Sequence, residues 1–470
     1  MKRATSPDLL LPLAPKSDTP LRLQVETGLR DAIRVGRLPT GSVLPSSRRL
    51  AADLGVSRGV VLGAYEQLVA EGYLLARGGS ATRVAPRGTE RGSEAAAAPA
   101  AAPMVRYDFR PGVPDLALFP RRAWLTSMRR AVDAAPNRAF DYPDARGVES
   151  CRTALAAYLN RGRATLTRAD RIVLCTGVVQ GFRLVCQVLH KRGFRSIAVE
   201  DPGYAYVSVE IEEEGLEKIP IPVDDQGLRT DLLDRTEARA VLLTPAHQFP
   251  TGAVLARQRR AALVDWASRR RAIIIEDDYD AEYRYDREPI GSVQGLAPDR
   301  VVYLGTASKV LSPGLRLGWI ALPVDLVDDT ARAKLEADRG SPVLEQLALA
   351  DFLERGELDR HLRKTRLIYR RRRDRLTAAL GTHLPELQPR GVAAGLHLMI
   401  ELGPGADEAM LVQVMASRSI CLFGASSYRA KPTAGPPALL LGYGRLEESA
   451  VDEGVRELAA VLHDHDGRRA

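Results

Sequence analysis

The pattern of apolar and polar positions divides the chain into two segments. In residues 21–38 apolar side chains recur every three or four positions, which predicts an amphipathic helix. Residues 44–74 predict two further helices separated by a turn at Gly55, and Ser57 is placed to cap the second one. Residues 74–85 carry two strand-like runs around a Gly-Gly pair, which predicts a β-hairpin. Three helices followed by a hairpin are typical of a winged helix-turn-helix.

Short apolar runs alternate with amphipathic helical patterns in the second segment. The strand-like runs occupy residues 171–177, 196–203, 240–246, 272–278, 301–308 and 317–322. Strands that alternate with helices predict an α/β fold with a mostly parallel, doubly wound sheet. Near the end of the chain a long helical pattern and shorter strands indicate a smaller α+β subdomain.

A stretch rich in Ala, Pro and Gly separates the two segments and contains almost nothing that could pack into a core. We therefore expect a winged helix-turn-helix domain at residues 17–85 and a linker at residues 86–104. The second domain is expected at residues 105–465, with a large part at about 140–335 and a small part at about 336–465.

Composition excludes several protein classes. The chain has 470 residues, of which 45% are hydrophobic and 27% charged, as in ordinary globular proteins. Its apolar runs are far shorter than the roughly 20 residues that span a bilayer, so no membrane association is expected. The four cysteines show no metal-ligand spacing, so we expect no metal site, and they are typical of reduced thiols in a cytoplasmic protein.

The net charge of +8 is concentrated at the start of the chain. Residues 1–88 contain thirteen basic and seven acidic residues, a net charge of +6. The other 382 residues contain 54 basic and 52 acidic residues and are nearly neutral. A small structural domain shows the same helix pattern, but a basic helix-turn-helix points to double-stranded DNA as a partner.

The first segment resembles the winged helix of the GntR family, with GRLPTGSVLPSSRRLAADLGVSR followed by AYEQLVAEGYL. The resemblance implies DNA contacts at the helix starts, from Arg48, Ser57 and Arg58, and in the hairpin wing, from Gly79 and Ser80. The basic Arg77 also lies in the wing, where a winged helix meets phosphates. The early part of the recognition helix departs from the usual polar pattern, because it has Gly59, Val60 and Gly63. Few side chains there can bond base edges, so specificity is expected to depend on Arg58, Arg48, a thymine-methyl contact of Val60 and DNA shape.

Two strand ends in the second segment carry chemistry. IIIEDDYDAEYRY (273–285) and VVYLGTASKVLSPGLRLGWI (301–320) each begin as an apolar strand and continue into polar residues. Ligands of open α/β sheets bind at the carboxyl ends of strands, so Asp277, Tyr279 and Lys309 are expected to converge. A lysine that forms a Schiff base, opposite an acid that pairs with a pyridinium nitrogen, is the arrangement that pyridoxal 5'-phosphate needs.

These motifs resemble fold-type I aminotransferases over about residues 107–465. The resemblance implies that Lys309 holds the cofactor as an internal aldimine and that Asp277 binds the pyridine nitrogen. It further implies that Tyr279 bonds the phenolic oxygen, which lowers the pKa of the aldimine, and that Tyr204 stacks on the ring. The phosphate would be held by Thr306, Ser308 and Arg316.

Further cofactor contacts follow from the same resemblance. In CTGVVQGF the amides of Val178 and Val179 open a helix and would bind the phosphate, although Val178 stands where the family commonly has Ser. Tyr142, in FDYPDARG, matches the tyrosine that reaches the neighbouring subunit's phosphate, which implies a homodimer.

Two other positions give weaker signals. In TPAHQFPTG, His247 and Gln248 replace the asparagines that aminotransferases place beside the cofactor. Arg445, in LLLGYGRL, lies where aminotransferases bind a substrate carboxylate, and a structural ion pair is the alternative.

Both modules in this order resemble the MocR transcriptional regulators. The resemblance implies a head-to-tail homodimer that binds DNA and senses pyridoxal phosphate or an amino compound, with control of vitamin B6 synthesis as one family role. Two alternatives stay open at this point. The chain could be a working aminotransferase with an attached DNA-binding module, or a regulator of amino-acid or GABA-type catabolism that responds to an amino-compound effector.

Overall fold

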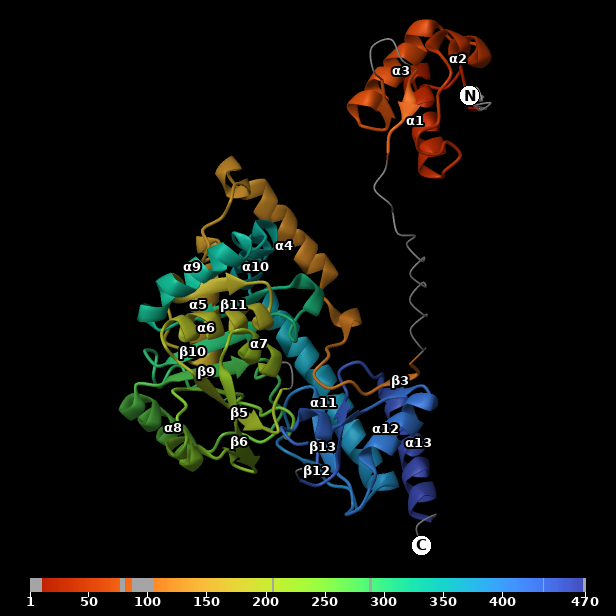
Figure 1. Cartoon of the computed structure of the whole chain (residues 1–470). Helices are drawn as coiled ribbons and strands as arrows, with labels where there is room; N and C mark the ends of the chain where they lie inside the picture. Colours follow the sequence, from red (N-terminus) through yellow and green to blue (C-terminus); the bar gives the residue numbers. More distant parts are fainter. Residues whose placement is uncertain are drawn as a thin grey trace. The chain divides into compact units, whose positions relative to one another are not determined.

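A computed structural model describes residues 11–76, 81–86, 105–204, 207–286, 290–433 and 435–467, with side chains up to residue 463. The chain forms two compact units, residues 1–102 and 103–470, which divide inside the predicted linker (Figure 1). No helix among the described residues combines the length and apolar character that crossing a membrane requires.

The first unit is the predicted winged helix. Its elements are α1 (Leu21–Arg34), α2 (Ser47–Leu54), α3 (Arg58–Ala70), β1 (Leu74–Leu75) and β2 (Arg83–Val84). Gly55 ends α2 with a φ of 65°, and the Ser57 hydroxyl caps α3 by accepting from the Val60 amide at 3.4 Å. Apolar faces of all three helices meet Leu74 and Val84 in one core, which confirms the helix-turn-helix and the hairpin.

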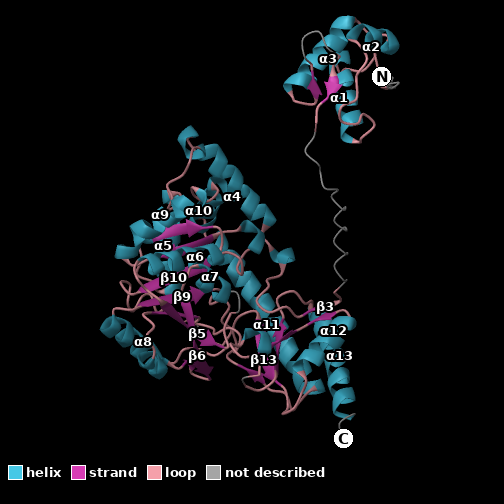
Figure 2. Ribbon diagram, viewed as in Figure 1, coloured by secondary structure: helices cyan, strands magenta, loops and turns pink. Residues whose placement is uncertain are grey.

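The second unit contains an eight-stranded sheet in the order β4-β11-β10-β9-β8-β5-β6-β7. Figure 2 shows strands of this sheet, among them β10, β9, β5 and β6, surrounded by helices. Its strands are β4 (Ile172–Cys175), β5 (Ser196–Asp201), β6 (Glu217–Asp224), β7 (Gly227–Leu228), β8 (Ala240–Leu243), β9 (Ile273–Asp278), β10 (Val301–Thr306) and β11 (Gly318–Ala321). The five strands from β10 to β6 run parallel, whereas β11 is antiparallel to both β10 and β4. The mostly parallel sheet is therefore confirmed.

Helices cover both faces of this sheet. Ile273 and Ile275 of β9 face a core formed with α6 and α9, whereas Ile274 between them faces a core formed with α8. This alternation within one strand is what burial on both faces requires. The helices of this region are α4 (Arg121–Ala134), α5 (Glu149–Arg163), α6 (Val178–Lys191), α7 (Val207–Glu213), α8 (Arg257–Arg270), α9 (Val327–Asp338) and α10 (Val343–Glu354).

The small part is built around a four-stranded antiparallel sheet in the order β12-β13-β16-β15. Its elements are α11 (Glu357–His383), β12 (Pro389–Arg390), β13 (His397–Glu401), α12 (Glu408–Ser417), β14 (Ile420–Cys421), β15 (Phe423–Gly424), β16 (Ala438–Gly442) and α13 (Glu448–Gly467). A short strand from the start of the unit, β3 (Tyr107–Asp108), pairs with β14.

Helix α10 differs from its expected place. It follows residue 336, where the small part is predicted to begin, yet it packs against α4 and α5 of the large part. The side chain of Gln346 in α10 fixes this packing by accepting from the Val148 amide at 2.7 Å. Single turns of 3-10 helix complete the unit at Leu116–Leu118, Asn137–Phe140, Ala169–Arg171, Thr230–Arg235, Pro313–Leu315, Val324–Leu326 and Ala425–Tyr428.

Candidate functional site

Asp277 and Lys309 lie at the carboxyl ends of neighbouring parallel strands. Asp277 stands opposite Leu304 in the β9–β10 register, and Lys309 follows the end of β10. Val310 and Leu311 are buried in the core directly after Lys309, and His361 Nε2 donates to the Val310 carbonyl at 2.8 Å. The backbone that carries Lys309 is therefore held firmly in place.

The electrostatics of this pair are those of a buried acid and a buried amine. Burial, and then the charge of Asp278, raise the pKa of Asp277 to about 7, against the opposing charge of Lys309. Burial lowers the pKa of Lys309, which Asp280 and Asp277 partly oppose. A lysine with a lowered pKa has more of the neutral amine that attacks carbonyl groups.

A buried oxygen of Asp277 without a hydrogen-bond partner in the described part of the chain indicates what kind of ligand the site fits. Asp277 is 8% exposed, and its buried Oδ1 has no hydrogen-bond partner. Leaving such an oxygen unpaired costs roughly 1–3 kcal/mol, so it needs a donor. None of the described residues supplies that donor. A protonated ring nitrogen is such a donor, and an amine that can bond an aldehyde lies nearby. These residues fit pyridoxal 5'-phosphate.

The amino end of α6 forms the anion-binding end of the site. Gly177 precedes the helix with a φ of 88° and no side-chain cap, which leaves the amides of Val178 and Val179 for a ligand. The Arg316 guanidinium lies against Gly177 and donates to the Thr176 carbonyl at 2.8 Å. A phosphate placed here would meet a helix amino end and a guanidinium.

Thr306 and Ser308 contribute unequally. The Thr306 hydroxyl is buried, accepts from the Ser308 amide at 3.1 Å and donates to the Ser308 hydroxyl at 2.9 Å. Thr306 therefore orients the turn before Lys309, whereas the half-buried Ser308 lies closer to solvent.

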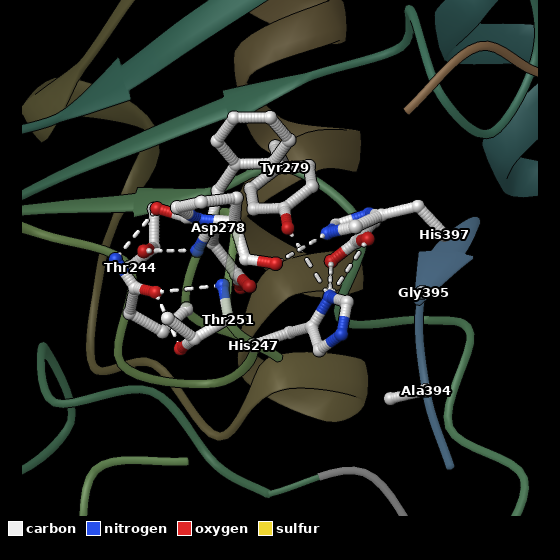
Figure 3. A network of polar contacts seen from close by, with 12 residues as sticks. Thr244, His247, Thr251, Asp278, Tyr279, Ala394, Gly395 and His397 are labelled. Carbon is white, nitrogen blue, oxygen red and sulfur yellow. Dashed lines mark hydrogen bonds and ion pairs between the residues drawn. The ribbon is translucent and has the colours of Figure 1, made fainter. Parts of the chain in front are cut away.

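Tyr279 belongs to a buried hydrogen-bonded group. Its hydroxyl lies 3.1 Å from Nδ1 of His247, and the two carboxylate oxygens of Asp280 lie 3.2 and 3.1 Å from the same nitrogen (Figure 3). Burial and the charges of Asp280 and Asp277 raise the pKa of Tyr279 well above its usual value, so the phenol keeps its proton. The role of His247 is uncertain from the sequence, and in the structure its side chain contacts Tyr279.

Aromatic side chains and two hydrogen bonds join the large and small parts beside Tyr204. Tyr204 is 38% exposed and its ring centroid lies 4.8 Å from that of Phe249, which also packs on Tyr428 at 5.0 Å. The Gly203 amide donates to the Tyr428 carbonyl at 2.8 Å, and the amide of Ala430 donates to Asp201 at 2.9 Å. Tyr204 therefore lies at the junction of the large and small parts.

Arg445 and Tyr142 make no contact with Lys309 or Asp277 among the interactions of the described residues. Arg445 lies 3.2 Å from Asp108 in an ion pair, and Asp108 also pairs with Arg110 at 2.6 Å. The structure thus contains the ion pair named as the alternative for Arg445. Tyr142 is 87% exposed.

The winged helix presents part of the expected DNA-binding set. Arg48 and Arg58 are exposed at the starts of α2 and α3. Ser57 uses its hydroxyl as the helix cap, and Val60 is half-buried against the core, so only part of its side chain can reach a thymine methyl group. The wing positions Arg77, Gly79 and Ser80 lie outside the described residues.

Sequence reasoning missed Asp280 and His397. Asp280 stands three residues after Asp277 in DDYDAEY, a spacing that gives no sign of a shared hydrogen-bond group. His397 is buried on β13, with its ring centroid 5.2 Å from that of His247. Its place in the apolar run LHLMIEL could have indicated a buried polar role.

Family models match both units. The model of the bacterial regulatory proteins of the gntR family matches residues 21–84, and the model of aminotransferase class I and II matches residues 115–452. Among solved structures, the multiple substrate aminotransferase from Thermococcus profundus superposes with a TM-score of 0.72 and 25% identity. That superposition covers 78% of this chain and 93% of the aminotransferase.

Two curated relatives contain both modules over their whole length. The pyridoxine biosynthesis transcriptional regulator PdxR of Corynebacterium glutamicum is 33% identical over 462 residues, or 97% of this chain and 99% of the relative. The probable rhizopine catabolism regulatory protein MocR of Rhizobium meliloti is 29% identical over 479 residues, or 96% of each chain. The chain therefore belongs to the MocR-type transcriptional regulators, in which a gntR winged helix-turn-helix is joined to a class I and II aminotransferase domain.

Proposed function

We propose that this regulator binds pyridoxal 5'-phosphate covalently through Lys309 and that its action on DNA depends on the occupant of that site. The unpaired, buried Oδ1 of Asp277 beside Lys309 carries the proposal. A buried acid of raised pKa with no partner is unfavourable without a ligand and becomes useful when a ring nitrogen shares its proton.

Each part of the cofactor has residues to hold it. Lys309 would bind the aldehyde and Asp277 the ring nitrogen, while Tyr204 would stack on the ring. Arg316, Ser308 and the first amides of α6 would bind the phosphate. When bound, the cofactor supplies an electrophilic aldehyde and a near-visible chromophore.

The regulatory step is a shift between two arrangements of the winged helices. A ligand can shift such an equilibrium only if it binds one arrangement more tightly than the other. We therefore expect the cofactor, or an amino compound that displaces Lys309 from it, to change operator affinity. The name of the relative PdxR favours vitamin B6 synthesis as the controlled process.

Absorbance tests the covalent site. The purified full chain mixed with pyridoxal phosphate should be yellow and keep its near-visible band through gel filtration. Lys309→Ala should lose the band, whereas the exposed-lysine control Lys191→Ala should retain it. A wild-type chain that takes up no cofactor would contradict the proposal. Titration of an operator with and without cofactor then tests whether occupancy reaches the DNA.

A homodimer is the second part of the proposal. Several large apolar side chains around α4 and the turn after it are exposed, including Leu125, Phe140 and Tyr142. Sedimentation of the full chain should give a dimer that Leu125→Asp weakens, while Leu296→Asp, at an exposed leucine outside this group, has no effect. A wild-type monomer at micromolar concentration would refute this part.

A working aminotransferase is the remaining candidate, because Lys309, Asp277 and Tyr279 match the residues that aminotransferases use to hold the cofactor's ring. Against it, Arg445 is already paired with Asp108 rather than left for a substrate carboxylate. A turnover assay with amino-acid donors separates the two, since a regulator should show at most slow half-reactions.

A further inference from the structure

Three oxygens converge on one nitrogen of His247, and that geometry restricts where hydrogens can lie. Nδ1 of His247 lies 3.1 Å from the Tyr279 hydroxyl and 3.2 and 3.1 Å from the two oxygens of Asp280. All three side chains are buried, with Asp280 only 1% exposed, so water does not compete for these bonds.

The hydrogen count favours one tautomer of His247. A carboxylate only accepts hydrogen bonds, so Asp280 requires a hydrogen on Nδ1. The alternative tautomer would bring a nitrogen lone pair against two carboxylate oxygens inside a buried site. With the hydrogen on Nδ1, the Tyr279 hydroxyl can only accept from His247 and has to donate its own proton elsewhere.

We propose that Asp280 and His247 are positioning residues that keep the Tyr279 hydroxyl proton available for the cofactor's phenolic oxygen. This inference rests on the proposed function, because it concerns how Tyr279 is prepared for the cofactor. In histidines generally, the hydrogen-bond partner of one ring nitrogen determines which nitrogen carries the hydrogen, and thereby which bonds the ring can make.

Gly395, which belongs to the small part, restricts the positions of His247 and Asp280. Gly395 has a φ of 70°, and its carbonyl accepts from the hydroxyls of Tyr285 and Tyr443, each at 2.7 Å. A Cβ at this position would lie 2.2 Å from Cε1 of His247 and 2.5 Å from Oδ2 of Asp280. Only glycine allows the backbone to approach this closely, so the pair has little room to rearrange.

Several other titratable groups face this cluster. Asp277, Glu200 and Tyr204, which lie at the ends of β9 and β5, also contribute to the raised pKa of Tyr279. The charges of Asp280 and Asp277 also act on the pKa of Lys309, which they raise. His397 on β13 faces His247, and burial together with that neighbour lowers the pKa of His397 to about 3, so it stays neutral. A test of the inference has to separate hydrogen-bond positioning from the direct charge of Asp280.

A double-mutant cycle on the cofactor-loaded full chain makes that separation. The pH midpoint of the cofactor's absorption change is measured for wild type, Asp280→Asn, Tyr279→Phe and the double variant. Removal of a negative charge alone lowers the midpoint, whereas loss of the tyrosine hydrogen bond raises it by about one pH unit. The shift caused by Asp280→Asn should be about one unit more positive with Tyr279 present than in the Tyr279→Phe background.

Equal shifts in the two backgrounds would overturn the inference, because Asp280 would then act through charge alone. The exposed-acid control Asp225→Asn should leave the midpoint unchanged. Cofactor uptake is recorded for each variant first. A wild-type chain that takes up none refutes the proposed function, whereas loaded chains with uncoupled shifts refute only the positioning role.

A second measurement uses the cofactor-free wild type, so its result does not depend on whether a variant with an altered cluster folds. Nitrogen NMR of histidine-labelled protein should find the hydrogen of His247 on Nδ1, whereas a hydrogen on Nε2 alone would overturn the inference. His247, Asp280 and His397 also lie close enough for a metal ion, with candidate ligand atoms within 4.8 Å of one another. A metal ion coordinated by Nδ1 of His247 would likewise overturn it, because that nitrogen would then carry no hydrogen.

Discussion

Replacement of Asp277 by asparagine is expected to stabilise the cofactor-free protein at alkaline pH while weakening its hold on the cofactor. The Asp277 carboxyl has its pKa raised from 3.8 to about 7 in the folded chain, mainly by burial. Between these two values the folded protein keeps a proton that the unfolded chain releases. Stability therefore falls as the pH rises from about 4 to about 7, and the loss is complete above that range.

The size of the effect follows from that shift. At 1.36 kcal/mol per pKa unit, the folded wild type loses about 4 kcal/mol in full, of which about 2 to 3 kcal/mol develops between pH 5 and pH 8. Asp277→Asn has no charge to bury and escapes this loss. Its stability relative to wild type should therefore improve by about 2 to 3 kcal/mol between those two pH values.

Urea unfolding followed by tryptophan fluorescence measures this difference. The three tryptophans of the chain, Trp124, Trp266 and Trp319, all belong to the second unit, so the signal reports the unit that contains Asp277. The exposed-acid control Asp225→Asn should show no such gain. A stability difference between Asp277→Asn and wild type that does not change with pH would refute the reasoning.

Three further predictions concern other parts of the chain. Arg58→Ala should weaken operator binding in a gel-shift titration and reduce its salt dependence by about one ion, because Arg58 is exposed at the start of α3; unchanged affinity would contradict its role. Gly177→Ala should lower cofactor affinity at least about tenfold by equilibrium dialysis, since its Cβ would lie 2.7 Å from the Arg316 guanidinium, whereas Gly193→Ala has a similar φ and open space and should bind normally. Tyr65→Phe should lower the thermal stability of the winged helix by about 1 kcal/mol, because the buried Pro45 carbonyl loses its 2.9 Å hydrogen bond, and equal melting temperatures would count against that bond.

Elements defined by local pattern could be predicted from the sequence. The helix start at Ser57 and the turn at Gly55 follow from capping chemistry that acts within a few residues. The strand runs could be located because each is apolar and β-branched over its whole length. The direction of β11 could not be predicted, because a buried strand of four apolar residues looks the same in parallel and antiparallel pairing.

The candidate site divides in the same way. Asp277 and Lys309 follow strands, so the topology of an open sheet brings them together. The contact of Gly395 with His247 and Asp280 joins segments more than a hundred residues apart, and no local pattern encodes it. The ion pair of Arg445 with Asp108 likewise connects residues that are 337 positions apart in the chain. It depends on the pairing of β3 with β14 in the small part.

The bonds from Gly203 to the Tyr428 carbonyl and from Ala430 to Asp201 have a consequence for timing. They tie the segment after β15 to the loop that carries Tyr204. If a ligand stacks on that ring as proposed, both bonds have to open before this segment can move away from it. Slow release makes a sensor respond to the average ligand supply over its residence time rather than to brief fluctuations. The contact between the large and small parts would then set the residence time of the ligand on the regulator.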